Sequence, residues 1–269
     1  MHHTTHRTHL LALLPTALLL LAALALPATR LAAWARLGHD TTTAIAEQNL
    51  TPKARAAVEK YLDGRSIIYF ASWMDEVRAT PEYKHTNEWH MGQVDENLRS
   101  TPAARRQKGD AVTALENTIA TLKNHKTLDR KTVVDNIKYL IHLVGDMHCP
   151  GHVYFPGINN WFNVTLLGKK TTYHAVWDSE LLNSIHNWSY SEYARHLDRA
   201  TPAERKTMSA GAPADWFHET AKESRVIYTW GVPDAVLDRN FTNAMQPLAE
   251  SQLQKAGYRL ARLLNELFE

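Results

Sequence analysis

The hydrophobic residues of the chain recur at helical spacing in its longest regular segments. Between Thr132 and Asp146 they return every three or four positions (Val133, Val134, Ile137, Leu140, Ile141 and Val144). The same spacing is found near the C-terminus (Leu253, Ala256, Leu260, Leu263, Leu264 and Leu267). Such spacing places the apolar side chains on one face of a helix. The pattern therefore predicts a helix in each segment and a fold built mainly from helices.

Four Thr-Pro pairs mark places where helices are expected to begin. Threonine suits the N-cap position, and proline at the first helical position gives up no hydrogen bond. The pairs are Thr51-Pro52, Thr80-Pro81, Thr101-Pro102 and Thr201-Pro202. Glu204 would complete a capping box with Thr201, and Gly64 is expected to end the helix that begins at Thr51.

One segment departs from the helical pattern. The stretch 163–173 carries β-branched residues around Gly168, which predicts a small β-hairpin there. Residues 34–269 contain no internal repeat, linker or low-complexity stretch. We therefore expect an all-α fold, with a single compact multi-helix domain over residues 34–269 and one small hairpin near 163–173.

The first 33 residues have a different composition. A polar start with Arg7 is followed by an apolar run from Leu10 to Leu26 and then by small residues. This order is typical of a secretory signal peptide, and no later segment is apolar enough to span a bilayer. An uncleaved N-terminal anchor is the alternative, against which Pro15 and the short run argue. Residues 1–33 are thus predicted to be a signal peptide, and the protein to be secreted or periplasmic.

Charge and cysteine content limit what the mature chain does. Removal of residues 1–33 takes away Arg7 and Arg30 and no acidic residue, which leaves 28 basic and 28 acidic residues. This balance gives no indication of a large basic surface that would by itself hold a nucleic-acid backbone. An anionic substrate would then need positive charge from bound metal. Cys149 is the only cysteine, so no intramolecular disulfide stabilises the fold.

Two His-x-x-x-Asp pairs carry the candidate chemistry. His142 and Asp146 lie four residues apart, which places them on one face of the predicted helix. Pro150 and Gly151 would end that helix, and His152 would lie on the turn that follows. Downstream, His174 and Asp178 repeat the spacing.

Further histidines and aspartates stand in aromatic surroundings, namely His39, Asp75 and His90. Imidazoles and carboxylates together suit zinc and related divalent ions, and one carboxylate can bridge two ions. A single such pair is more often a solvated surface pair, but two pairs beside apolar residues favour a metal site. His85 and His148 remain alternative ligands. Cys149 is a minor candidate, and otherwise a small buried hydrophobic residue.

These motifs, taken in order, resemble a known family. Trp34 is followed five residues later by His39, and then come SWMDEVR, EWH, HLVGDMHCPGH and HAVWD. The set is similar to the trinuclear-zinc family of secreted single-strand-specific nucleases and 3′-nucleotidases. Members of that family share an all-helical fold with zinc-dependent phospholipase C. The resemblance covers essentially all of residues 34–269.

The resemblance implies three Zn²⁺ ions and nine ligand residues. The first ion would be held by Asp75, His90, His142 and Asp146, and the second by His152, His174 and Asp178. The third would take His39, an oxygen of Asp146, and the amino nitrogen and carbonyl oxygen of Trp34. That amino group exists only if the signal peptide is cut directly before Trp34. The stretch Ala23-Leu24-Ala25 is a competing cleavage signal that would leave Leu26 first.

The implied reaction is hydrolysis of phosphodiester bonds in single-stranded RNA and DNA to 5′-nucleotides, with 3′-nucleotidase activity. A hydroxide bridging the first and third zinc ions would attack phosphorus. The catalytic residues would be Asp75, Asp146 and Arg78, whose guanidinium suits the charge that develops on a phosphoryl group. The alternative for Arg78 is a surface salt bridge with Glu76 or Glu82.

Substrate contacts are expected from Arg78, Asn160 and Tyr154. Asn160 matches the asparagine of a Gly-Gly-Asn run common in the family, although the two glycines are absent here. Tyr154, like Phe155 and Trp161, has an aromatic ring on which an unpaired base can stack, with core packing as the alternative.

Two other functions remain open. A phospholipase C acting on phosphatidylcholine-type lipids would use the same cluster, but in that branch the last pair resembles His-x-x-x-Glu, whereas this chain has Asp178. A non-catalytic zinc-binding protein would need only closed sites of four ligands. We expect a monomer that acts on single-stranded nucleic acid and 3′-nucleotides, without a stable protein partner and without a membrane span in the mature chain.

Overall fold

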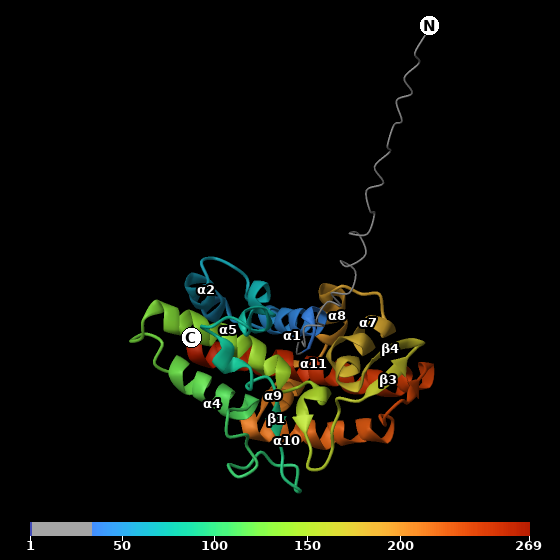
Figure 1. Ribbon diagram of the computed structural model, residues 1–269. Helices are drawn as coiled ribbons and strands as arrows, with labels where there is room; N and C mark the ends of the chain where they lie inside the picture. The colour runs from blue at the N-terminus through green and yellow to red at the C-terminus, as the bar shows by residue number, and fades with distance from the viewer. Residues whose placement is uncertain (2–33) are drawn as a thin grey trace. The chain divides into compact units, whose positions relative to one another are not determined.

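The computed structural model describes Met1 and residues 34–269, so the predicted signal peptide lies outside the described residues. Residues 34–269 belong to one compact unit. Helices make up most of the described residues and the strands are short, which confirms the predicted all-α fold (Figure 1). In residues 34–269, no helix is both long and apolar enough to cross a membrane.

Three helices form the centre of this unit. They are α1 (Arg36–Gln48), α5 (Arg130–Asp146) and the C-terminal α11 (Arg239–Phe268). The contact between α1 and α11 is the most extensive between any two elements, and α5 packs against both (Figure 1). The two helices expected from apolar spacing, α5 and α11, are thereby confirmed.

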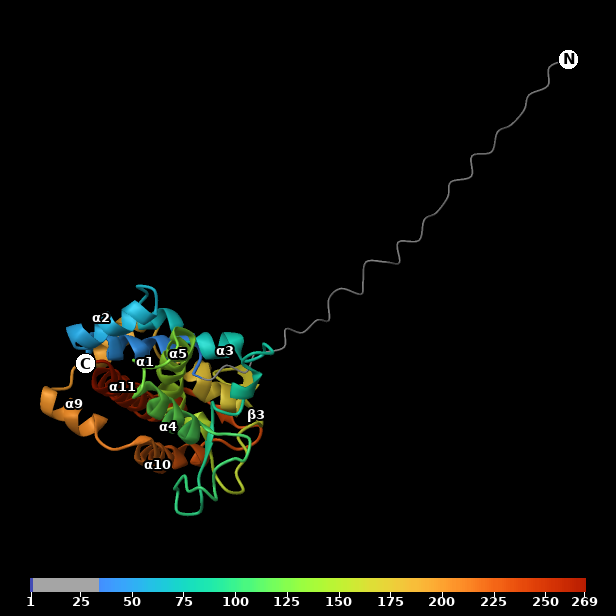
Figure 2. The same cartoon turned by 90° about the vertical axis from the view of Figure 1, so that its left-hand side faces the viewer.

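The remaining helices surround this centre. They are α2 (Pro52–Tyr61), α3 (Trp73–Val77), α4 (Ala111–Leu122), α6 (Tyr173–Ala175), α7 (Leu181–Ile185), α8 (Tyr190–Leu197), α9 (Pro202–Ser209) and α10 (Pro213–Ser224). Short 3₁₀ turns are η1 (Ile67–Phe70), η2 (Lys84–Thr86), η3 (Pro150–His152) and η5 (Arg225–Thr229), and η4 (Val176–Glu180) is a π-helical turn. Seen from the side, α3 lies beside α5 and α10 lies below α4 (Figure 2).

Two of the four Thr-Pro pairs begin helices as predicted. The Thr51 side chain accepts a hydrogen bond from the backbone N–H of Ala54 at the start of α2. Thr201 and Glu204 form the expected capping box of α9. Gly64 follows the end of α2 with a φ of +74° and donates its N–H to the Glu59 carbonyl, as expected for a helix stop.

The other two Thr-Pro pairs do not begin helices, and that expectation is wrong. The Thr80 hydroxyl donates to the Val77 carbonyl and so closes the preceding α3. After Thr101 the chain makes only turns. The sequence PAARRQKG that follows Thr101 carries no apolar stripe, so a helix there would bury nothing to offset the cost of its nucleation.

The predicted hairpin is present as β3 (Asn163–Leu166) and β4 (Lys169–Thr172). Leu167 and Gly168 join the strands with φ values of +47° and +86°, as a two-residue primed turn requires. Two further short pairings were not predicted. Strand β5 (Val236–Leu237) runs parallel to β3, and β1 (Gly92–Gln93) runs parallel to β2 (Val153–Tyr154). Strands of two residues are too short to leave a periodic signal in the sequence.

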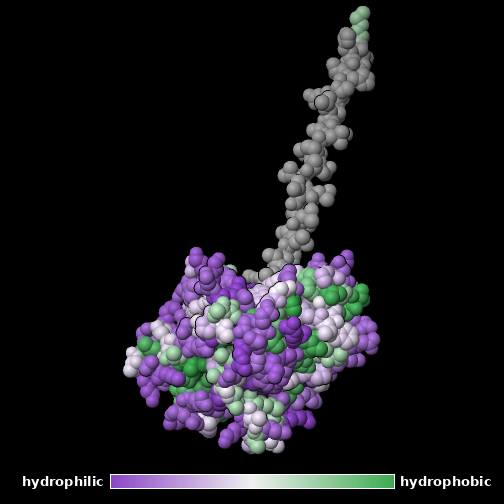
Figure 3. Space-filling model, turned by 90° about the horizontal axis from the view of Figure 1, so that it is seen from below, coloured by the Kyte–Doolittle hydropathy of each residue, from purple (hydrophilic) through white to green (hydrophobic). Residues whose placement is uncertain are grey.

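Two apolar clusters make up most of the core. The larger one surrounds α4, α5 and the C-terminal half of α11, and the second surrounds α6, η4 and the hairpin. The clusters adjoin at the end of α5, since Met147 belongs to the first and Cys149 to the second. On the face that Figure 3 shows, hydrophobic residues form separate patches in a mainly hydrophilic surface.

Gly257 allows the close contact between α1 and α11. A Cβ atom at this position would lie 2.5 Å from Cγ2 of Ile45. We therefore expect Gly257→Ala to lower the free energy of unfolding by about 1–3 kcal/mol, because overpacking outweighs the better helix propensity of alanine. Urea denaturation measures the change. Asn243→Ala, at an exposed position of α11, is the matched control and should not destabilise the protein.

Candidate metal centre

Eight histidine and aspartate side chains predicted to bind metal converge at the junction of the two apolar clusters. They come from α1 (His39), α3 (Asp75), the turn before β1 (His90), α5 (His142 and Asp146), η3 (His152), α6 (His174) and η4 (Asp178). All are buried except Asp75, whose side chain is 11% exposed. Seven of these eight side chains are therefore shielded from solvent.

Asp146 is the central carboxylate. One of its oxygens, Oδ2, lies 2.9 Å from Nδ1 of His90 and 3.2 Å from Nε2 of His142. The other, Oδ1, lies 3.4 Å from Nε2 of His39 and 3.5 Å from Nδ1 of His152. A single carboxylate therefore contacts four imidazoles that belong to four different segments of the chain.

Asp178 is the centre of a second group. Its Oδ1 lies 2.9 Å from Nε2 of His152, and its Oδ2 lies 3.3 Å from Nε2 of His174. His152 uses one ring nitrogen toward Asp146 and the other toward Asp178, and so it links the two groups. The pair of His174 and Asp178 has the expected spacing, but it lies where α6 passes into the π-helical turn η4, a geometry that is frequent at functional sites.

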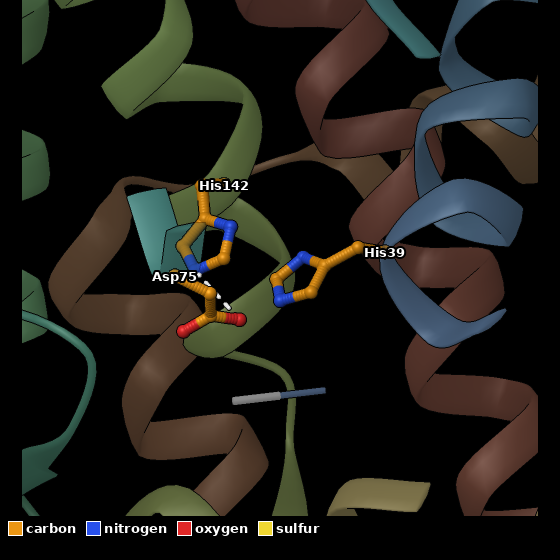
Figure 4. Close-up of side chains that lie close together, drawn as sticks. All are labelled: His39, Asp75 and His142. Carbon is orange, nitrogen blue, oxygen red and sulfur yellow. Dashed lines mark ion pairs between the residues drawn. The ribbon is translucent and has the colours of Figure 1, made fainter. Parts of the chain in front are cut away.

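Asp75 completes the first group at its exposed side. Its carboxylate oxygens lie 3.7 Å from Nδ1 of His90 and 3.8 Å from Nε2 of His142. The rings of His39 and His142 are stacked with their centroids 3.9 Å apart. Figure 4 shows these two rings, one from α1 and one from α5, on the same side of Asp75.

Two glycines permit close contacts between the segments that carry the eight side chains. A Cβ atom at Gly145 of α5 would lie 2.8 Å from Nδ1 of His39, and one at Gly151 would lie 2.9 Å from Cβ of Trp177. A side chain at Gly145 would therefore push α1 and its histidine away from Asp146. Helix α5 has a glycine next to its last residue because another element must approach the backbone there.

Backbone contacts orient the ligand nitrogens. Nδ1 of His142 donates a hydrogen bond to the carbonyl oxygen of Ala71, at 2.8 Å. In the neutral ring, Nε2 is then the nitrogen with a free lone pair, and this atom faces Asp146 and His90. Such a support on the outer nitrogen is usual for metal-binding histidines.

The charges of the site shift the pKa values of its groups. Burial opposes protonation of His142, but the negative charges of Asp146 and Asp75 outweigh it and raise the pKa of His142 to about 9. Burial likewise opposes the charge of Asp178, but His174 and His152 lower its pKa to about 2. Burial lowers the pKa values of His39 and His90. The two carboxylates are therefore charged, and they favour a cation between them and the imidazoles.

The donor set fits metal ions. Several buried ring nitrogens and carboxylate oxygens have no hydrogen-bond partner, namely both ring nitrogens of His39, Nε2 of His90, Oδ1 of Asp75, Oδ1 of Asp146, Nδ1 of His152 and Nδ1 of His174. Buried polar atoms without partners are costly and rare. Metal binding would engage atoms of this kind. Three triads have ligand atoms within 4.8 Å of one another (His39, Asp75 and His142; His90, His142 and Asp146; Cys149, His152 and Asp178).

The alternative ligands His85 and His148 lie elsewhere. His148 is buried, but its Nδ1 contacts the Val144 carbonyl at 2.7 Å and its Nε2 contacts the Arg259 guanidinium at 2.7 Å. His85 is exposed and contacts the edge of the Trp89 ring. The geometry therefore favours His90 and His152 over these two alternatives.

Comparison with known proteins identifies the family. The family model S1/P1 nuclease matches residues 34–269. The chain belongs to the S1/P1 nuclease family. Relatives include Endonuclease 5 of Arabidopsis thaliana, 25% identical over 87% of this chain and 90% of the relative, and Nuclease P1 of Penicillium citrinum, 24% identical over 87% and 97%. Nuclease S1 of Aspergillus oryzae is 21% identical over 86% of this chain and 91% of the relative.

Membership in this family confirms the predicted resemblance. It also supports the predicted activity at the level of a hydrolase that acts on the phosphodiester bonds of nucleic acid. The identities of 21–25% are too low to transfer finer properties of the relatives. The ligand assignments and substrate contacts of this S1/P1 nuclease therefore stay predictions.

Arg78 lies at the edge of the nuclease site. Its Nη1 is 3.6 Å from Oδ1 of Asp75, and its side chain is 19% exposed. The alternative partners, Glu76 and Glu82, instead pair with other basic residues. The position agrees with a role toward substrate, which stays a prediction.

Asn160 is buried in this nuclease and braces the second group. The side-chain amide of Asn160 donates a hydrogen bond to the backbone carbonyl of Gly151 at 2.6 Å. The backbone carbonyl of Asn160 accepts one from the backbone N–H of His174 at 3.0 Å. These contacts join the segments that carry His152 and His174. The predicted contact of Asn160 with substrate is a separate role and remains a prediction.

The three aromatic candidates of the nuclease have different surroundings. Tyr154 is half-buried, and the Arg106 guanidinium lies over its ring, 5.2 Å from the centroid. Phe155 is buried in the core, as the packing alternative proposed. The Trp161 ring stacks on the His174 ring with centroids 4.1 Å apart, which no sequence spacing indicated.

Trp34 begins the described domain of the nuclease. Its indole is buried against Gly38 of α1. The next residue, Ala35, donates its N–H to the carbonyl oxygen of Asp178 at 2.7 Å. The start of the domain is thus attached to the segment that carries the second carboxylate, and ligation by Trp34 stays a prediction.

Gly145 leaves space for the His39 ring, and His39 is predicted to ligate a metal ion. We therefore expect Gly145→Ala to weaken binding of that ion by about 10-fold or more, the scale of losing a supporting contact in a metal site. Elemental analysis after dialysis measures the metal content. Gly64→Ala is the control, since a Cβ there meets nothing within 4 Å and only the backbone is strained. Equal metal content in both variants would contradict this role of Gly145.

Proposed function

We propose that this chain is a zinc-dependent endonuclease that hydrolyses single-stranded RNA and DNA to 5′-nucleotides and removes 3′-phosphates from nucleotides. The observation that carries the proposal is the contact of one buried carboxylate, Asp146, with four histidines. In a member of a nuclease family, a donor set of this type supports metal-assisted hydrolysis of phosphodiesters.

The proposed centre holds three zinc ions. The first would be held by Asp75, His90, His142 and Asp146, the second by His152, His174 and Asp178, and the third by His39, Asp146 and Trp34. Bound zinc would supply a Lewis acid that polarises the phosphoryl group and lowers the pKa of water. Asp146 supports this assignment because its two oxygens face different histidines.

Asp75 and Arg78 together form the side of the centre that substrate can reach. They are the partly exposed members of an otherwise buried group, and Asp75 holds the Arg78 guanidinium beside the cluster. A guanidinium forms two parallel hydrogen bonds to phosphate oxygens, and it is most useful where negative charge develops in the transition state. We assign Arg78 to orienting the phosphate.

Unpaired bases would stack on aromatic rings near the centre. Tyr154 is two residues from His152, and the half-buried Trp161 stacks on His174. Stacking on an aromatic face is tolerant of base identity and needs a base that is free of its partner strand. Both rings therefore support a preference for single strands.

The proposed activity can be tested with a panel of substrates. Single-stranded DNA, single-stranded RNA and a 3′-mononucleotide should be hydrolysed, while duplex DNA and phosphatidylcholine should react far more slowly. Chelation should abolish hydrolysis and added Zn²⁺ should restore it, because bound zinc is the proposed Lewis acid of the reaction. Release of a choline-type head group as the main activity would instead identify a phospholipase.

A variant pair controls this test. Asp146→Asn should lower kcat/KM on single-stranded DNA by about 100-fold or more, the scale of losing one charge-stabilising group. Asp135→Asn changes a carboxylate on the same helix that pairs with Lys131 and lies outside the cluster, so it should keep activity. Undiminished activity in the Asp146 variant would exclude the proposed centre.

We also propose that the signal peptide is removed directly before Trp34 and that the enzyme is secreted or periplasmic. The family match begins at residue 34, and the bond from Ala35 to Asp178 attaches this end of the domain to the metal centre, which supports the proposal.

N-terminal sequencing of the exported protein should therefore give Trp34 as the first residue. A mature protein that begins at Leu26 would lack the amino ligand, and it should then bind one ion fewer by elemental analysis. A Leu26 start together with full metal content would contradict the role of Trp34.

A further inference from the structure

The only cysteine of the chain lies beside the second carboxylate. Cys149 is completely buried, and its Sγ is 3.7 Å from Oδ1 of Asp178. The same oxygen is 2.9 Å from Nε2 of His152. A thiol, an imidazole and a carboxylate thus meet at one point, with their ligand atoms within 4.8 Å of one another.

The spacing of these atoms resembles the edges of a zinc coordination tetrahedron. With bonds of about 2.3 Å to sulfur and about 2.0 Å to nitrogen and oxygen, neighbouring sulfur and oxygen ligands lie about 3.5 Å apart, and nitrogen and oxygen about 3.3 Å apart. The observed separations from Oδ1 of Asp178 are 3.7 Å to sulfur and 2.9 Å to nitrogen. The sulfur and the imidazole nitrogen also lie within 4.8 Å of each other, so local adjustment of the three side chains would bring all three atoms onto one ion.

His174 leaves room for this sulfur. Its Nε2 faces the other oxygen of Asp178, Oδ2, at 3.3 Å, and its ring lies parallel to that of His152 with centroids 5.3 Å apart. The Cys149 sulfur approaches the carboxylate at Oδ1 instead. Cysteine and His174 therefore do not compete for the same oxygen.

Within the second apolar cluster, the thiol of Cys149 also has polar neighbours. Besides Asp178, Sγ lies 3.9 Å from the carbonyl oxygen of Trp177, a long contact for a weak donor. A buried sulfur that faces a carboxylate and an imidazole has the surroundings of a ligand, since thiolate and imidazole are both preferred by zinc.

We propose that the Cys149 thiolate is a fourth protein ligand of the second metal ion, together with His152, His174 and Asp178. The inference rests on the proposed metal centre and adds to it. On ligation the Sγ–H bond breaks, its proton leaves to solvent and the sulfur–metal bond forms. A thiolate adds a negative charge and a soft ligand, so this position should hold zinc and cadmium more tightly than a site of nitrogen and oxygen alone.

The single cysteine makes the proposal directly measurable. A thiolate bound to Co²⁺ gives a charge-transfer absorption band in the near ultraviolet, and in this chain such a band can come only from Cys149. The purified protein loaded with Co²⁺ should show the band. Cys149→Ser should lack it and should bind one of its ions at least about 10-fold more weakly.

Met147→Leu is the matched control, because it removes a neighbouring buried sulfur without a large change in volume. The band should persist in this variant. Because the wild-type spectrum alone decides the point, poor folding of the serine variant would not weaken the test.

The outcomes separate this inference from the proposed function. Wild-type protein with full Co²⁺ content and nuclease activity but without the band would overturn the thiolate ligand and leave the metal nuclease intact. Protein that binds no metal would overturn both. A band that survives in Cys149→Ser would also exclude the proposal.

Discussion

The buried carboxylate of Asp146 is the group on which the arrangement of the centre depends. It is fully buried, and an isolated charge in such a place would be strongly unfavourable. Four imidazoles from α1, α5, η3 and the turn before β1 offset that cost. Each of these segments must therefore reach the end of α5 for the fold to be stable, and a site for cations results from the same packing.

The packing around this carboxylate explains several features that are otherwise unconnected. Gly145 has no side chain at the point where His39 approaches α5, and Gly151 has none at the point where Trp177 approaches η3. The parallel pairing of β1 with β2 holds the chain after His90 next to the chain after His152. His152 contacts both Asp146 and the second carboxylate, Asp178, beside which Cys149 lies. The proposed metal ligation and the stability of the fold thus depend on the same contacts.

The distribution of charge agrees with an enzyme that acts on a polyanion through metal ions. Residues 34–269 have equal numbers of acidic and basic residues, so the surface of this domain as a whole gives little attraction to nucleic acid. At the centre, Arg78 beside Asp75 is one source of positive potential for a phosphate, and any ions bound there would add to it.

The sequence alone determined the local features: the helices with regular apolar spacing, the 163–173 hairpin, and the pairs His142–Asp146 and His174–Asp178. These depend on residues at most a few positions apart, whose relation the backbone geometry sets. Only the tertiary structure decided that Thr80 and Thr101 begin no helix, that His148 binds Arg259 instead of the cluster, and that Trp161 stacks on His174. Those outcomes depend on segments distant in the sequence, because packing against the core, and not local propensity, decides whether a helix forms and which way a buried side chain points.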